Sequence, residues 1–220
     1  MKREEVCALI KKIGILPSVR VASQDLAYFA AETVYAAGIP IVEITLTVPD
    51  AIEIVNNLAK RYPDLAVGAG TILDEDSAKR CVDAGASFLT SPGIVPEVVD
   101  YARIAEVAVL PGALTPTEII AAWKAGSDFV KIFPTGHVGG IQYVRALKVP
   151  FPQIPLIATG GVNQANASDF IRAGATAIGV GGEMLPKEAL HFRQADRIRE
   201  LAGRFLSMVK EARALRETNH

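Results

Sequence analysis

Apolar and polar residues follow one another along the chain in a repeating order of short and long segments. The short segments are rich in β-branched residues and have the length of strands. They cover residues 15–20, 39–46, 65–70, 88–92, 107–112, 129–135, 154–159 and 177–182. Their starts lie 19 to 26 residues apart, which is enough for one strand, one helix and two short loops. The pattern therefore predicts eight strand–helix units.

The longer segments have the apolar spacing of helices and carry signals for helix ends. We predict helices at residues 24–37, 50–61, 75–84, 117–125, 167–173 and 196–215. A glycine that can adopt the left-handed conformation follows four predicted helices, at Gly38, Gly85, Gly126 and Gly174. The sequence Thr115-Pro116-Thr117-Glu118 has the N-cap and N1 residues typical of a helix start.

The even repeat predicts an α/β fold in one domain, which we expect to span residues 1–220. No segment rich in Ser, Gly and Pro divides the chain. Eight parallel strand–helix units close most naturally into a (β/α)8 TIM barrel, whose sites lie at the C-terminal ends of the eight strands. The competing fold is an open doubly wound sheet. It needs a glycine fingerprint after its first strand, where this chain has Arg20-Val21-Ala22-Ser23.

The composition is that of a globular protein without a large charge imbalance. Half of the residues are apolar, 21% are charged and the formal net charge is −1, so we expect no nucleic-acid partner. No apolar run reaches the roughly 18 residues that span a membrane, and residues 1–5 lack the apolar block of a signal peptide. We therefore expect no membrane association and a cytoplasmic location. Cys7 and Cys81 fit no metal motif and are expected to be free, mostly buried thiols.

Two charged residues interrupt apolar strands, where an unpaired charge would be costly to bury. Lys131 lies in the segment 129–135, and Glu43 lies in the segment 39–46. The alternation of side chains along a strand places both on the face that lines the barrel. The other lysines, Lys148 among them, lie in helical or loop contexts, where we expect them to be solvated.

A lysine and a glutamate that share a barrel interior can carry out imine chemistry. An apolar, cation-rich surrounding favours neutral amine, and the neutral amine of Lys131 would be a nucleophile toward ketones. Glu43 could then act as a general base for the proton transfers of imine formation and carbon–carbon cleavage. The alternative is a buried ion pair with a structural role only.

Several residues at the predicted strand ends could bind a small anionic substrate. Arg20 follows the first strand and could hold a carboxylate through two hydrogen bonds. The sequence Gly68-Ala69-Gly70-Thr71 offers a bare backbone suited to close approach of a substrate. Two glycine pairs follow the last two strands, where barrels commonly bind phosphate: Gly160-Gly161 after Thr159, and Gly181-Gly182. A surface arginine and plain tight turns are the alternative interpretations.

Other common chemistries have less support in the sequence. The three histidines, His137, His191 and His220, lack the spacing of metal ligands. The chain has neither the Gly-x-Ser-x-Gly elbow of esterases nor a nucleotide-binding P-loop. We therefore expect no metal and no cofactor. His137 follows the sixth strand and could touch a substrate, but we favour a mobile loop residue without that role.

Six short motifs then point to one family. They are Val42-Glu43-Ile44-Thr45-Leu46, Val67-Gly68-Ala69-Gly70-Thr71, Ser91-Pro92-Gly93, Leu110-Pro111-Gly112, Val130-Lys131-Ile132-Phe133-Pro134 and Thr159-Gly160-Gly161-Val162. In this order they resemble the class I 2-keto-3-deoxy-6-phosphogluconate (KDPG) and 4-hydroxy-2-oxoglutarate (KHG) aldolases. The resemblance covers about residues 15 to 185.

The resemblance implies a homotrimeric barrel that cleaves a 2-oxo acid reversibly and releases pyruvate. Lys131 would form an imine with the pyruvyl half, and Glu43 would move protons. The remaining residues would bind substrate. Thr71 would hold the pyruvate carboxylate, Pro92 and Phe133 would wall the pocket, and Gly160, Gly161, Gly181 and Gly182, with Thr159 beside them, would receive a distal phosphate.

Two positions depart from the family pattern. Many members carry a carboxylate-binding Arg where this chain has Thr47, and Arg20 could replace it from the neighbouring strand. Phosphate-binding members usually have Ser where this chain has Gly182, and here Glu183 adds a negative charge beside it. An inward Glu183 would favour a shorter or uncharged aldehyde half, whereas an outward Glu183 would leave the backbone free to bind phosphate.

The preferred function is thus an aldolase for KDPG, with KHG as a second substrate. The first alternative is an aldolase for another 4-hydroxy-2-oxo acid, either unphosphorylated or of the galactonate type. A second is a barrel that binds a sugar phosphate without catalysis, with Lys131 as a structural cation. A third is a phosphosugar epimerase or isomerase that uses Glu43 as a base and forms no imine.

Overall fold

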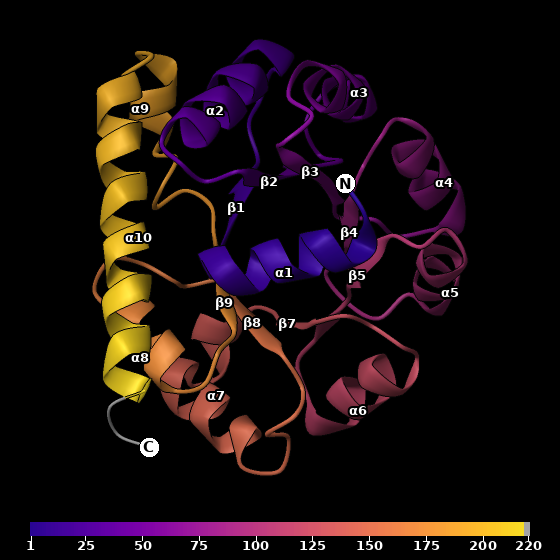
Figure 1. Cartoon of the computed structure of the whole chain (residues 1–220), viewed down its shortest axis with the longest axis vertical. Helices are drawn as coiled ribbons and strands as arrows, with labels where there is room; N and C mark the ends of the chain where they lie inside the picture. Colours follow the sequence, from indigo (N-terminus) through magenta and orange to yellow (C-terminus); the bar gives the residue numbers. More distant parts are fainter. Residues whose placement is uncertain (218–220) are drawn as a thin grey trace.

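A single parallel sheet curls around the centre of the molecule, with helices outside it (Figure 1). The structure is a computed structural model and describes residues 1–217, so that His220 lies outside it. Neighbouring strands are hydrogen-bonded in the order β5-β4-β3-β2-β1-β9-β8-β7-β6. The strands are β1 Ile15–Val19, β2 Ile41–Thr45, β3 Ala66–Gly70, β4 Phe88–Thr90, β5 Ala108–Leu110, β6 Gly112–Ala113, β7 Val130–Ile132, β8 Leu156–Thr159 and β9 Ala177–Val180.

The two ends of this sheet, β5 and β6, are separated only by Pro111. β5 pairs with β4 and β6 pairs with β7, so the segment that contains both closes the sheet into a barrel. The Lys131 N–H donates to the Pro111 carbonyl at 2.9 Å across the junction. Proline has no N–H to give to a ladder, which accounts for the interruption. The predicted segment 107–112 is therefore one barrel strand in two pieces, and the predicted TIM barrel is confirmed.

The helices form a ring outside the barrel (Figure 1). They are α1 Arg3–Ile13, α2 Gln24–Ala36, α3 Ala51–Arg61, α4 Glu75–Asp83, α5 Pro96–Ile104, α6 Pro116–Lys124, α7 Gly140–Lys148, α8 Ala167–Arg172, α9 Lys187–His191 and α10 Ala195–Glu217. A 3-10 helix, η1 Thr135–Val138, precedes α7. All six predicted helices are present within a residue or two of the predicted ends.

The end signals also act as predicted. Thr115 Oγ1 accepts from the Glu118 N–H, and the Glu118 carboxylate accepts from the Thr115 N–H at 2.6 Å, which forms a capping box. The glycines after the four helices have φ angles of 88°, 101°, 93° and 108° in chain order. A side chain is strained at such angles, so glycine is needed where each helix turns back toward the sheet.

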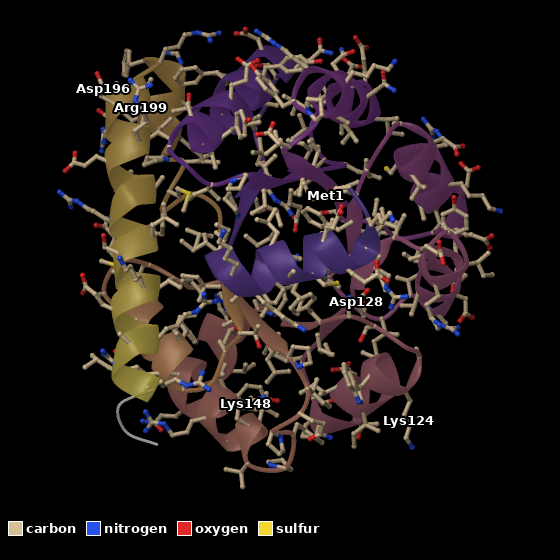
Figure 2. All side chains as sticks on the ribbon, viewed as in Figure 1. Met1, Lys124, Asp128, Lys148, Asp196 and Arg199 are labelled. Carbon is tan, nitrogen blue, oxygen red and sulfur yellow. The ribbon has the colours of Figure 1, made fainter. Side chains whose placement is uncertain are left out.

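Helix α1 crosses one end of the barrel (Figure 1) and leaves the other end for a site. Gly14 joins α1 directly to the start of β1, so α1 covers the N-terminal ends of the strands. Val6 and Ile10 on this helix are fully buried. Arg3 Nε donates to Asp128, which is labelled in Figure 2, at 2.9 Å, and Asp128 also accepts from the Val109 N–H at 2.9 Å. Helix α1 thus covers the barrel end with buried apolar side chains, and the Arg3–Asp128 ion pair holds its first turn in place.

Lys148 differs from the solvated residue that the sequence suggested. Its side chain, labelled in Figure 2, is half-buried. Nζ donates to the carbonyls of Phe151, Pro152 and Ile154 at 3.1, 2.9 and 2.8 Å. Burial lowers the pKa of this amine, and Arg216 adds to the effect. Lys148 therefore holds the loop between α7 and β8 in place. The helical pattern around Lys148 did not indicate this role, because the carbonyls that it binds lie beyond the end of α7.

Both cysteines are free, with Cys81 buried and Cys7 half-buried. Burial raises the pKa of Cys7 to about 12, with a further contribution from Asp128, and raises that of Cys81 to about 11. The thiolate is the reactive form, so both should be inert near neutral pH.

We expect iodoacetamide to modify neither thiol in the native protein while it modifies both in urea, as read by intact mass. Rapid native labelling of Cys81 would contradict this packing.

No helix within residues 1–217 is long and apolar enough to cross a membrane.

Candidate active site

Lys131 and Glu43 both project into the barrel interior, as the strand alternation predicts. Lys131 lies on β7 and is 8% exposed, and Glu43 lies on β2 and is 2% exposed. Lys131 Nζ is 3.7 Å from Glu43 Oε2. The amine also lies over the ring of Phe133, with the ring centre 5.6 Å from Nζ. A primary amine thus faces a carboxylate and an aromatic wall with little access to bulk water.

Two hydroxyl groups that belong to none of the residues predicted for the site hold the Glu43 carboxylate. Ser18 Oγ on β1 donates to Oε1 at 2.9 Å. Thr90 Oγ1 on β4 donates to Oε2 at 2.9 Å. Strand alternation could have placed each hydroxyl inside the barrel, but only the register between strands shows that both reach the same carboxylate.

The glycines of β3 have a different role from the one predicted. A Cβ on Gly68 would lie 2.2 Å from the ring of Phe88, and a Cβ on Gly70 would lie 2.4 Å from Glu43 Oε1. The space beside each glycine is therefore occupied by a side chain of the protein itself, Phe88 or Glu43. The interpretation of these glycines as a surface for substrate was wrong. They create the space in which the carboxylate sits.

One cavity of about 410 Å³ brings the predicted site residues together. It opens at the C-terminal ends of the strands, where a barrel holds its ligands. Its lining contains all of the predicted residues, namely Arg20, Glu43, Thr71, Pro92, Lys131, Phe133, Thr159, Gly160, Gly161, Gly181 and Gly182. The lining also contains Ser18, Val162, Asn163, Gly179 and Glu183.

Arg20 and Thr71 lie together at the mouth of the cavity. Arg20 is exposed, and its Nη2 donates to Thr71 Oγ1 at 3.3 Å. Thr71 has a φ of 64°, which is unusual and strained for a β-branched residue. Strain of this kind concentrates at functional sites, because the surrounding structure must maintain it. A guanidinium and a hydroxyl thus lie side by side in the lining of the cavity.

The two positions that depart from the family pattern differ in their relation to the cavity that contains Lys131. Thr47 is exposed and absent from the lining of the cavity, and its hydroxyl is 2.8 Å from that of Thr45. Glu183 is also exposed, but it lines the cavity next to Gly182. Arg20 therefore supplies the guanidinium at this site, while a carboxylate stands at its entrance.

The hydroxyl of Thr159 is buried and has no hydrogen-bond partner within residues 1–217. It lies over Gly179, where a Cβ would come within 2.3 Å of Oγ1. Since both residues line the cavity, the space that glycine leaves is occupied by this hydroxyl. A buried hydroxyl without a partner is rare, and a substrate oxygen in the cavity would satisfy it.

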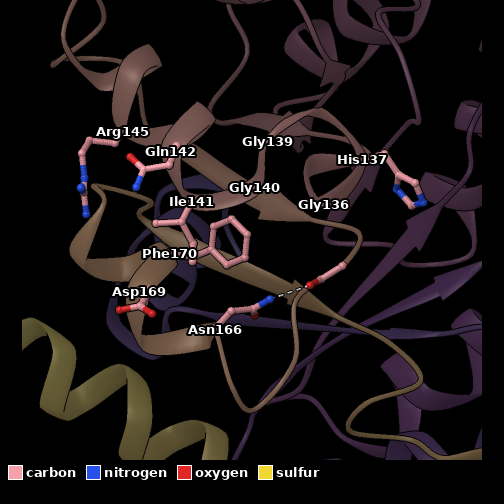
Figure 3. Close-up of a pocket in the computed structure, with 11 residues that line it drawn as sticks. Gly136, His137, Gly139, Gly140, Ile141, Gln142, Arg145, Asn166, Asp169 and Phe170 are labelled. Atoms are coloured by element: carbon pink, nitrogen blue, oxygen red, sulfur yellow. Dashed lines mark hydrogen bonds between the residues drawn. The ribbon is translucent and has the colours of Figure 1, made fainter.

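The glycine pair after Thr159 packs against Gly136 and is hydrogen-bonded to Asn166. Gly160 and Gly161 have φ angles of 84° and 86°. A Cβ on Gly161 would lie 2.8 Å from the Cα of Gly136, so the two backbones touch. Asn166 Nδ2 donates to the Gly161 carbonyl at 2.8 Å (Figure 3). The pair is thus fixed in a conformation open only to glycine.

A separate cavity of about 630 Å³ lies behind this glycine pair (Figure 3). His137 lines this second cavity and does not line the one that contains Lys131. It lies in η1 and is absent from the lining around Lys131, so it does not belong to the candidate site. Within residues 1–217, no three His, Cys, Asp or Glu side chains gather closely enough to hold a metal ion.

Comparison with known proteins gives consistent matches over almost the whole chain. The family model described as KDPG and KHG aldolase matches residues 6–201. A 2-dehydro-3-deoxy-phosphogluconate aldolase of Pseudomonas aeruginosa is 33% identical over 209 residues, which cover 93% of this chain and 94% of that protein. A KHG/KDPG aldolase of Escherichia coli K12 is 30% identical over 188 residues, with 86% and 88% covered.

Solved structures agree with these matches. A structure described as native KDPGal has a TM-score of 0.84 at 30% identity and covers 91% of this chain and 96% of its own. KDPG aldolase from Legionella pneumophila, with pyruvate captured as a covalent carbinolamine, has a TM-score of 0.83 at 29% identity, with 89% and 95% covered. A cage designed by fusing symmetric oligomeric domains has a TM-score of 0.85 at 28% identity, with 94% and 76% covered.

Proposed function

The chain belongs to the KDPG and KHG aldolase family, and from that premise we propose that Lys131 is the residue that forms the imine. The protein is a carbon–carbon lyase, an aldolase of the Schiff-base class. It cleaves KDPG reversibly to pyruvate and glyceraldehyde 3-phosphate, with KHG, which gives pyruvate and glyoxylate, as a second substrate. The observation that supports the role of Lys131 most directly is its buried amine, 3.7 Å from the Glu43 carboxylate inside the cavity.

The reaction begins when the neutral Lys131 amine attacks the C2 carbonyl of the 2-oxo acid. The carbinolamine loses water and becomes an iminium ion, and Glu43 carries the protons that these steps move. Glu43 then removes the proton of the C4 hydroxyl as the C3–C4 bond breaks. The bonding electrons pass into the iminium group, which leaves an aldehyde and an enamine. Protonation of the enamine at C3 and hydrolysis release pyruvate and restore the amine.

The carboxylate of the pyruvyl half binds Arg20 and Thr71 in this proposal. Their side chains touch at the cavity mouth, and a guanidinium can hold a carboxylate through two charge-assisted hydrogen bonds. Pro92 and Phe133 line the same cavity and flank the bound pyruvyl group. Arg20, directly after β1, takes the place of the family arginine at the position of Thr47.

Replacing Arg20 with alanine should weaken binding of the pyruvyl half. Loss of a charge-assisted hydrogen bond raises KM for the 2-oxo acid roughly tenfold to a hundredfold. Steady-state kinetics measure this change, with Arg61→Ala as control, because Arg61 pairs with Glu32 on the outer surface. Equal KM values in the two variants would remove Arg20 from the site.

The distal phosphate of KDPG is assigned to the backbone of Gly160, Gly161, Gly181 and Gly182. The left-handed angles of the first pair and the open space around Gly182 support this assignment. The carboxylate of Glu183 at the entrance opposes it. That opposition favours a second candidate, an unphosphorylated 4-hydroxy-2-oxo acid, as an alternative substrate.

A coupled assay with lactate dehydrogenase tests the substrate assignment. Pyruvate release should be fastest from KDPG within a panel of phosphorylated and unphosphorylated 4-hydroxy-2-oxo acids. Faster release from an unphosphorylated member would establish the second candidate. Thermal stabilisation by a sugar phosphate with no pyruvate released from any member would instead indicate a binding protein and reject the aldolase.

We further propose that the chain acts as one domain spanning residues 1–220, as a homotrimer in the cytoplasm. The sequence resemblance supports the trimer, and the similarity to a component of a cage built from symmetric oligomeric domains supports an oligomer. Light scattering coupled to size exclusion gives the mass in solution, and the mass of one chain would contradict the trimer.

A further inference from the structure

We propose that Ser18 and Thr90 are positioning residues that hold the Glu43 carboxylate in its working orientation while the charge on Lys131 changes during the reaction. This inference rests on the proposed function, in which Glu43 is the base. It assigns a role in proton transfer to two hydroxyl groups that contact Glu43 rather than the reacting atoms.

Each oxygen of the carboxylate has its own hydroxyl donor. Ser18 Oγ lies 2.9 Å from Oε1, and Thr90 Oγ1 lies 2.9 Å from Oε2. Thr90 is 1% exposed and Ser18 is half-buried at the cavity wall. The donors come from β1 and β4, so they hold the carboxylate from two directions and restrict its rotation.

The strand between Glu43 and Thr90 is built to permit this contact. β3 separates β2 from β4 in the barrel. Gly70 on β3 carries no side chain, and a Cβ there would lie 2.4 Å from Glu43 Oε1 and 2.6 Å from Cδ. Thr90 therefore reaches across a glycine to the carboxylate. The hydrogen bond from Thr90 depends on Gly70, because a side chain at Gly70 would displace the Glu43 carboxylate.

The Glu43 carboxylate needs these neutral donors because the amine of Lys131, its charged partner, loses its charge during the reaction. An ionised carboxylate that is 2% exposed must be compensated by hydrogen bonds or opposite charge. Lys131 Nζ is 3.7 Å away, beyond hydrogen-bond distance, and the amine must be neutral when it attacks the ketone. Ser18 and Thr90 keep the same charge at every step.

Hydroxyl groups also suit both protonation states of a base. A serine or threonine O–H donates to a carboxylate, and the same oxygen accepts from a carboxylic acid after rotation about the C–O bond. Glu43 can therefore gain and release a proton without losing its partners. Thr90→Val or Ser18→Ala would leave one oxygen of the Glu43 carboxylate without its hydroxyl donor in a buried site.

Proton exchange on pyruvate isolates this step from cleavage and from the aldehyde half. Pyruvate bound as the iminium ion gives a C3 proton to Glu43 and becomes an enamine. Return of a deuteron from exchanged solvent to C3 labels the methyl group, and hydrolysis releases deuterated pyruvate. Incubation in D2O, followed by NMR of the methyl signal, gives the exchange rate. Borohydride trapping of the same samples gives the fraction of chains that carry the imine.

Thr90→Val and Ser18→Ala should each slow exchange at saturating pyruvate by roughly tenfold to a hundredfold. The trapped fraction at saturation should stay at the wild-type level, because both hydroxyls donate to Glu43 and not to Lys131. The conservative variants Thr90→Ser and Ser18→Thr keep the hydroxyl and should restore most of the rate. Because Ser18 is half-buried at the cavity wall, its variants carry the test alone if Thr90→Val does not fold.

Thr45→Val is the matched control. Thr45 is fully buried on the same face of β2 as Glu43, but its hydroxyl donates to the Val19 carbonyl at 3.0 Å. Its loss should lower the unfolding midpoint and leave the exchange rate unchanged.

Exchange at the wild-type rate in both Ser18→Ala and Thr90→Val would overturn the positioning role. A parallel fall in exchange and trapping that the conservative variants do not restore would also overturn it, since that result marks a purely structural contribution. Failure of the proposed function itself gives a different result, because the wild-type protein would then neither trap pyruvate nor exchange its protons.

Discussion

Replacing Lys131 with methionine is expected to lower turnover by roughly 10⁴ to 10⁶-fold, as removal of a covalent nucleophile does in other enzymes. Methionine fills a similar volume in the 8%-exposed position but has no nitrogen, so no imine can form. The loss also leaves Glu43 without a cation, which by itself would disturb the site. One variant therefore cannot separate the nucleophile from the charge.

Lys131→Arg makes that separation. A guanidinium keeps the positive charge near Glu43 and stays protonated, so it does not attack a ketone. Both variants should be inactive in pyruvate release, and the unfolding midpoint should fall more in Lys131→Met than in Lys131→Arg. Activity in Lys131→Arg above about a hundredth of wild type would show that Lys131 acts as a cation and forms no imine.

Glu43→Gln is expected to slow turnover by roughly 10² to 10⁴-fold, the usual contribution of a general base. The amide has the shape of the carboxylate, and the hydroxyls of Ser18 and Thr90 can donate to its oxygen or accept from its nitrogen. The site should therefore keep its structure while the proton acceptor is lost. Part of the trapped imine should remain, because the amine is intact.

Steady-state kinetics and borohydride trapping of Glu43→Gln separate these effects. Glu53→Gln is the control, since Glu53 is exposed in the first turn of α3. Turnover in Glu43→Gln equal to that in the control would exclude Glu43 from the mechanism. An epimerase or isomerase that used Glu43 alone would lose activity in this variant and keep it in Lys131→Met.

Features that depend on local chemistry could be predicted from the sequence. The strand positions follow from short apolar runs, and the helix ends follow from glycines that adopt left-handed angles after α2, α4, α6 and α8. Lys131 and Glu43 could be assigned to the barrel interior because side chains alternate along a strand and charges in apolar strands need a reason.

Features that depend on the register between strands could not be predicted. Ser18 and Thr90 lie 25 and 47 residues from Glu43 in the chain, and no local pattern links them to it. The same limit explains the interpretation of Gly68 and Gly70. A glycine in a strand indicates a close neighbour, but the sequence does not show whether that neighbour is a ligand or, as here, a side chain from the next strand.

The most direct test of the imine on Lys131 is reduction of the protein with borohydride in the presence of pyruvate, followed by peptide mass analysis. The peptide that contains Lys131 should carry a stable 1-carboxyethyl group on the lysine nitrogen, and samples without pyruvate or with Lys131→Met should carry none. An unmodified Lys131, or an adduct on another lysine at equal yield, would contradict the account.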